Sequence, residues 1–135
     1  MARLIEELKR DHVEIGNLLA RLKDHRVTNA EAHKILLEAQ ASLLAHLKKE
    51  DFQLYPVLNR AAEKDAGLKR TIDFYAKDMD EITKNAAAFF QKYSKRDAPV
   101  DLEFAKAFGN LFATISRRLR SEETSLYQEY EKLNQ

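Results

Sequence analysis

Five polar residues of this 135-residue chain recur at positions where an amphipathic helix would bury leucine or isoleucine: His12, His46, Glu50, Arg118 and Glu122. Burying a polar group without a hydrogen-bond partner costs on the order of 2–7 kcal/mol, and burying a charge costs more. These side chains are therefore expected to face one another and to share a partner. Imidazole nitrogens and carboxylate oxygens together suit iron, zinc or manganese, so a metal ion is the predicted partner.

The spacing of His46 and Glu50 places both side chains on one face of a helix, one turn apart. A carboxylate in this position can bridge two cations while imidazoles hold each of them, as in the di-iron carboxylate bundles. Arg118 and Glu122 repeat the spacing in the second half of the chain, with arginine in place of histidine. A single pair at this spacing is a weak signal, and its recurrence makes it more specific.

Four long segments carry the apolar rhythm of three- and four-residue steps that is typical of bundle helices. Their apolar stripes run over residues 5–22, 36–54, 72–93 and 104–126. The links between them are short, and short links between long helices favour antiparallel neighbours. The sequence therefore predicts an all-α fold, an up-down-up-down four-helix bundle formed by one domain over residues 1–135.

The predicted helix boundaries rest on local chemistry. Thr28 has a glutamate three residues later, the spacing of a capping box, so a helix should begin just after it. Pro56 should kink or stop the second helix near Tyr55. Gly67 suits the left-handed residue that ends a helix, and the polar residues 94–99 should link the third helix to the fourth.

An internal repeat relates the two halves of the chain. Residues 11–15 match residues 78–82, and residues 46–56 match residues 118–128. One loop insertion would explain the small difference between the two offsets. The chain is therefore interpreted as a duplicated helical hairpin whose matching blocks centre on the polar residues of the stripes.

The predicted helix lengths bring the polar residues to one level of the bundle. His12 precedes Thr28, and His46 follows it, by similar numbers of residues, which correspond to about 24 and 27 Å of helix at about 1.5 Å per residue. Tyr55 and Tyr127 stand at matching positions of the repeat and are expected to pack below this layer.

The repeated blocks resemble the hemerythrin-like, or HHE cation-binding, family, and the resemblance extends over essentially the whole chain, in residues 11–15, 46–56 and 122–127. It implies a four-helix bundle with a non-haem di-iron centre, to which each half supplies one histidine and one His-x-x-x-Glu pair. The ligands that it implies here are His12, His46, Glu50 and Glu122. It also implies iron as the cofactor and a role in storing iron or in sensing iron, oxygen or nitric oxide.

Two positions depart from the family pattern, because Met79 and Arg118 stand where the resemblance implies histidines. All four histidines lie in the first half of the chain, at positions 12, 25, 33 and 46. The remaining donors suit iron or a single zinc ion. Alternatively, the guanidinium of Arg118 satisfies the two glutamates, and the domain is a metal-free regulatory or protein-interaction bundle.

Composition excludes several other classes. Lys and Arg total 23 against 22 Asp and Glu, so no basic excess indicates nucleic acid or an acidic membrane as a partner. The absence of cysteine excludes disulfides, thiolate metal sites and cysteine catalysis. No secretory signal, membrane-spanning segment, glycine-rich phosphate loop or other enzyme signature is recognised. A cytoplasmic, non-enzymatic protein is expected, and a protein partner is left open.

Overall fold

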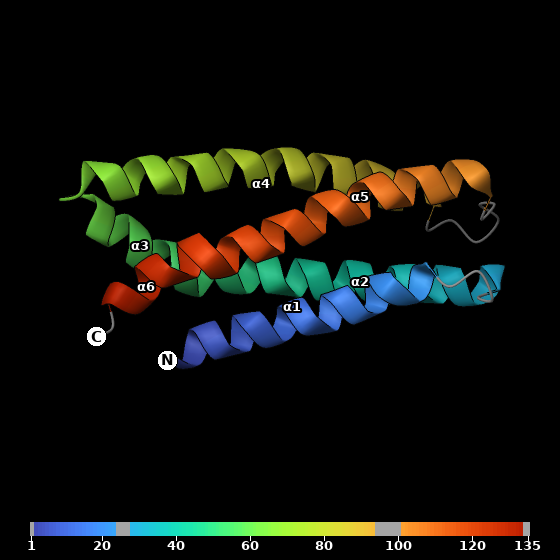
Figure 1. Ribbon diagram of the computed structural model, residues 1–135, viewed down its shortest axis with the longest axis horizontal. Helices are drawn as coiled ribbons and strands as arrows, with labels where there is room; N and C mark the ends of the chain where they lie inside the picture. Colours follow the sequence, from blue (N-terminus) through green and yellow to red (C-terminus); the bar gives the residue numbers. More distant parts are fainter. Residues whose placement is uncertain (1, 24–27, 94–100, 134–135) are drawn as a thin grey trace.

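The computed structural model describes residues 2–23, 28–93 and 101–133, and every secondary-structure element in this part of the chain is a helix. Its long helices are α1 (Arg3–Leu22), α2 (Asn29–Lys49), α4 (Ala66–Tyr93) and α5 (Leu102–Ser121). They run alternately in opposite directions along the long axis of the molecule (Figure 1). The predicted up-down-up-down four-helix bundle is therefore confirmed.

Helices α2 and α5 both continue through a five-residue π-helical segment. These segments are η1 (Glu50–Leu54), which leads into α3 (Tyr55–Ala62), and η2 (Glu122–Leu126), which leads into α6 (Tyr127–Leu133). They begin at equivalent positions of the sequence repeat, so the duplicated hairpin extends to this irregular feature. Single π turns within α-helices are often found at functional sites, and nothing in the apolar spacing predicted them.

Of the predicted boundaries, the one at Thr28 matches the structure and the one at Pro56 differs from it. The Thr28 hydroxyl accepts a hydrogen bond from the backbone N–H of Glu31 at 3.1 Å, and α2 begins at Asn29. The helix does not end near Tyr55 as predicted; its geometry changes there from π-helical to α-helical. Pro56 lies in the first turn of α3, where the missing N–H of a proline is least costly.

The prediction for Gly67 is wrong. Gly67 lies in the first turn of α4, and no described glycine has a positive φ. The reason is the Asp65 carboxylate, which accepts a hydrogen bond from the backbone N–H of Leu68 at 3.1 Å and so begins a new helix before the glycine. The link predicted over residues 94–99 lies outside the described residues.

The apolar core is divided into two clusters by a layer of polar residues. On α1, Leu8 belongs to one cluster and Ile15 to the other, and His12 lies between them. Along α5 and η2, Ile115 and Leu126 similarly flank the buried Arg118 and Glu122. Apolar side chains above and below therefore separate this polar layer from water. Within the described chain, no helix is both long and apolar enough to span a membrane.

Candidate metal centre

The four residues named from the sequence as metal ligands converge in the polar layer. His12 comes from α1, His46 from α2, Glu50 from η1 and Glu122 from η2, and each side chain is buried. One potential ligand atom from each residue lies within 4.8 Å of the other three. We call these four residues the His/Glu cluster. Two nitrogen and two oxygen donors thus face one small volume.

The imidazoles point their Nε2 atoms toward each other and toward the carboxylates. Nε2 of His12 lies 3.1 Å from Nε2 of His46 and 3.1 Å from Oε1 of Glu122. Nε2 of His46 lies 3.4 Å from Oε2 of Glu50. This orientation is the one that a cation between the four side chains would require.

Two further carboxylates hold the other nitrogen of each imidazole. Oε2 of Glu123 lies 2.7 Å from Nδ1 of His12, and Oδ2 of Asp11 lies 2.9 Å from Nδ1 of His46. Each carboxylate favours a proton on Nδ1, which leaves Nε2 available to a metal ion. The Lys49 ammonium also donates to Asp11, at 3.0 Å.

The sequence interpretation missed both of these carboxylates. Asp11 was visible in the repeat, because the block 11–15 begins with it, but no role was assigned to it. Glu123 follows the predicted ligand Glu122 at the edge of the stripe, where a charged residue is expected to be solvated, but its carboxylate contacts the buried imidazole of His12. The other two histidines give no further donor: His33 lies outside the cluster, and His25 lies outside the described residues.

Arg118 is buried beside the His/Glu cluster, as predicted. Its Nε donates to Oε2 of Glu122 at 2.9 Å, and its Nη1 donates to Asp78 at 3.0 Å and to the backbone oxygen of Tyr75 at 2.9 Å. Its Nη2 donates to the Tyr55 hydroxyl at 3.3 Å. The sequence prediction had the guanidinium serving both cluster glutamates, but its contact is with Glu122.

The repeat explains where this guanidinium lies. Asp78 is the repeat counterpart of Asp11, and Arg118 is the counterpart of His46. The Asp78–Arg118 hydrogen bond therefore corresponds to the Asp11–His46 hydrogen bond. The second half of the bundle retains the supporting carboxylate but places a fixed positive charge where the first half has an imidazole.

Met79 takes the position that corresponds to His12. It is half-buried, packs against the apolar cluster that contains Ile15, and offers no cationic or acidic group. A cavity of about 10 Å³ lies where Met79 approaches Arg118, His46 and Glu122. This volume is at the lower limit of what one water molecule needs.

Tyr127 was expected to pack below the layer, and that expectation is wrong for its hydroxyl group. The side chain is fully buried, and its oxygen lies 2.7 Å from Oε2 of Glu50, 3.1 Å from Oε1 of Glu122 and 2.9 Å from Nε2 of His12. Residues five apart do not share a face in a regular α-helix. The π turn of η2 brings Tyr127 to the side of Glu122, so α-helical periodicity could not reveal it.

The two cluster glutamates differ in their electrostatic environment. Burial, reinforced by the neighbouring charge of Glu122, raises the pKa of Glu50. Burial also disfavours the charged form of Glu122, but close contacts with the imidazoles of His12 and His46 and the charge of Arg118 outweigh it and hold the pKa of that carboxyl well below its usual range.

Oε1 of Glu50 is buried and has no hydrogen-bond partner among the described residues. Unsatisfied buried polar atoms are rare in native proteins, and they often mark the place of an ion or a water molecule. The donor set and this oxygen therefore fit one cation.

The protonation of His46 leads to a prediction for the metal-free protein. Burial opposes its charge, but contacts with Glu122 and Glu50 raise the pKa of His46 from 6.5 to about 10. Stabilisation from the charged imidazole is then complete below pH 6.5 and is lost as the pH rises to about 10. We expect the urea midpoint to fall over this interval, and to fall less in His46→Gln. Equal slopes in the two proteins would contradict this.

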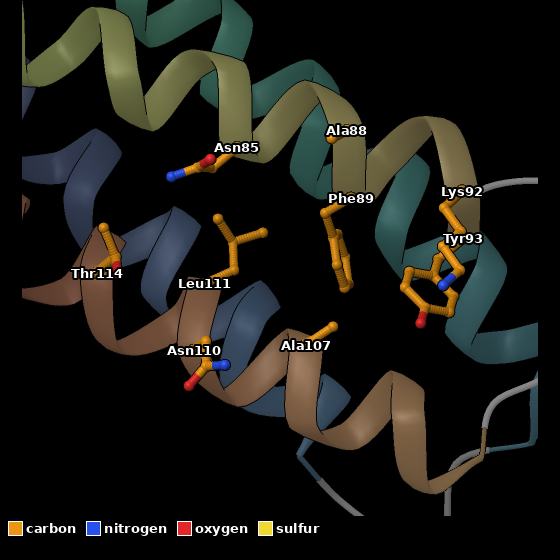
Figure 2. Close-up of a pocket in the computed structure, with 9 residues that line it drawn as sticks. All are labelled: Asn85, Ala88, Phe89, Lys92, Tyr93, Ala107, Asn110, Leu111 and Thr114. Carbon is orange, nitrogen blue, oxygen red and sulfur yellow. The ribbon is translucent and has the colours of Figure 1, made fainter.

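A separate pocket of about 330 Å³ lies between α4 and α5 (Figure 2). Phe89 and Leu111 reach into it from the two helices, and Lys92 and Asn110 lie at its edge. It shares no residue with the His/Glu cluster. The buried histidines and glutamates of the described chain therefore lie at the cluster and not in this pocket.

Comparison with known proteins identifies a family for the chain. The family model of the hemerythrin HHE cation binding domain matches residues 3–130. Neither the curated proteins nor the solved structures contain a significant match to the chain.

Proposed function

Because this chain belongs to the hemerythrin HHE cation-binding family, we propose that it binds one metal ion through His12, His46, Glu50 and Glu122. The observation that carries the proposal is the buried, unpartnered Oε1 of Glu50, which lies in a group of four converging donor residues. Iron is the ion that we propose, in keeping with the family resemblance. Zinc is the alternative that two imidazoles and two carboxylates would also accept.

Arg118 favours a single ion over a pair. Its guanidinium already uses Oε2 of Glu122, the oxygen that would otherwise be free to bridge toward a second ion. The same guanidinium brings a permanent positive charge to the second half of the site, where it would repel another cation. Met79 adds no ligand nitrogen there.

We propose sensing of oxygen or nitric oxide as the use of a bound ferrous ion, which would supply a binding position for such a small ligand. The cavity beside His46, Met79 and Arg118 supports this. A second cavity, of about 70 Å³, lies between α2 and α4 and shares Met79 and two leucines with the first. The larger cavity is lined mainly by apolar side chains and would suit a small uncharged molecule.

A second candidate function is a metal-free bundle that acts through a protein partner. Arg118 neutralises Glu122, and the Tyr127 hydroxyl donates to Glu50, so both carboxylates already have a contact without an ion. Under this alternative the His/Glu cluster is a structural remnant. Metal analysis separates the two candidates.

The test is the metal content of protein produced with added iron and purified without chelator. We expect about one ion per chain, because one set of four donors is present. Glu50→Gln should weaken binding at least tenfold, since it removes a charged donor directly facing the ion. His33→Gln, in α2 and outside the cluster, is the control and should bind as the wild type does.

The metal-free alternative predicts a different result. In that case the wild type contains no stoichiometric iron or zinc, and adding either ion leaves its melting temperature unchanged. This outcome would overturn the metal-binding proposal.

A further inference from the structure

We propose that Tyr127 is a fifth protein ligand of the bound ion, coordinated through its deprotonated phenol oxygen. The inference rests on the proposed function and deepens it, because it specifies a hard oxygen donor beside the imidazoles and carboxylates. Such a donor favours ferric iron over softer ions.

The position of the hydroxyl carries the inference. The phenol oxygen contacts every member of the His/Glu cluster, at 2.7 Å from Glu50, 2.9 Å from His12, 3.1 Å from Glu122 and 3.5 Å from His46. A cation held by those four side chains would necessarily lie within reach of this oxygen. Tyr127 would thus have to coordinate the ion or withdraw from it.

Withdrawal is disfavoured by the packing of the ring. Tyr127 has no exposed surface, and its ring stacks on the imidazole of His12 with a centroid separation of 5.4 Å. Leu54, Leu58 and Leu126, all fully buried, belong to the same apolar cluster as Tyr127. A densely packed side chain moves only when its neighbours move as well.

The cluster has fewer hydrogen-bond donors than the carboxylate oxygens around the phenol require, and this gives a second argument. The phenol has one hydrogen, which can serve one strong acceptor at a time, while oxygens of both Glu50 and Glu122 lie within hydrogen-bond distance. A cation in contact with the phenol oxygen and both carboxylates would compensate all three oxygens at once. On coordination the metal–oxygen bond forms, the O–H bond breaks, and the proton is released to solvent.

The repeat supplies an independent comparison. Tyr55, the counterpart of Tyr127, has its hydroxyl oxygen 3.3 Å from Nη2 of Arg118. On the side of the site where Arg118 lies, therefore, the tyrosine oxygen lies against a fixed cation. Coordination by Tyr127 would give the side that holds His12 and His46 the same arrangement, with the metal ion as the cation.

The experiment uses the full chain loaded with ferric iron, supplied as a soluble ferric chelate and followed by removal of the excess. Phenolate bound to ferric iron gives a visible charge-transfer band and resonance-enhanced phenolate vibrations, which imidazole and carboxylate ligands do not give. We expect both signals in the wild type. Tyr127→Phe should retain the fold and lose them, and Tyr55→Phe, the matched control, should keep them.

The outcomes separate this inference from the proposed function. A wild type that holds one ferric ion but shows no phenolate vibrations would overturn the role of Tyr127 and leave the four-residue site intact. Unchanged signals in Tyr127→Phe would also overturn it. A wild type that binds no metal at all would overturn both proposals. The vibrational measurement on the wild type needs no variant, so a Tyr127→Phe protein that fails to fold would not block the test.

Discussion

Replacing Met79 and Arg118 together by histidine is expected to raise the iron content from about one to about two ions per chain, because the repeat would then supply two equivalent donor sets. The substitutions restore an imidazole at the counterparts of His12 and His46. They also free Oε2 of Glu122 from the guanidinium. Asp78 already lies where it could accept a hydrogen bond from the new histidine at 118, as Asp11 accepts one from His46. Metal analysis after growth with added iron measures the result.

The single variants serve as controls for the double variant. Met79→His alone leaves the positive charge of Arg118 in place, so its iron content should stay near that of the wild type. If the double variant is folded and still gains no iron over the wild type, these two residues are not the reason for the incomplete site.

The four residues of the His/Glu cluster could be found from the sequence because they obey helical periodicity. His46 and Glu50 are one α-helical turn apart, and each member replaces an apolar residue in a regular stripe. Short links between long stripes then determine the antiparallel arrangement. The fold and the convergence of these residues thus depend only on regular geometry.

Features of the site that depend on irregular geometry were not accessible in this way. Tyr127 reaches the cluster because η2 is π-helical, and an α-helical projection places it away from Glu122. Asp11 and Glu123 contact the imidazoles from the edge of the stripes, where charged residues are normally solvated. Gly67 was misassigned because the capping aspartate two residues earlier begins the next helix first.

The repeat contained more information than the stripes did. Asp11 and Asp78 occupy matching positions next to residues of very different type, His12 and Met79. A shared aspartate beside a changed residue indicates a role that both halves retain. In the structure that role is to accept a hydrogen bond from the residue at position 46 or its counterpart, Arg118.

Arg118→Met should destabilise the metal-free protein by about 3–5 kcal/mol, the usual effect of removing one partner from a buried ion pair. The loss leaves Glu122 charged, buried and without its guanidinium, and it leaves Asp78 without its hydrogen bond. Arg117→Met is the matched control, since that side chain is exposed on the same helix and should change the stability little. Urea unfolding in the presence of a chelator measures both variants.

Metal should then reverse part of this effect. Without the guanidinium, an ion bound to the His/Glu cluster is repelled less, and both oxygens of Glu122 are available to it. Arg118→Met should therefore bind the ion more tightly than the wild type does. Binding to the folded state alone raises the free energy of unfolding in proportion to the logarithm of ligand concentration over Kd. Iron or zinc should therefore stabilise Arg118→Met more than the wild type. Equal stabilisation of the two proteins would mean that Arg118 does not compete with the ion for Glu122.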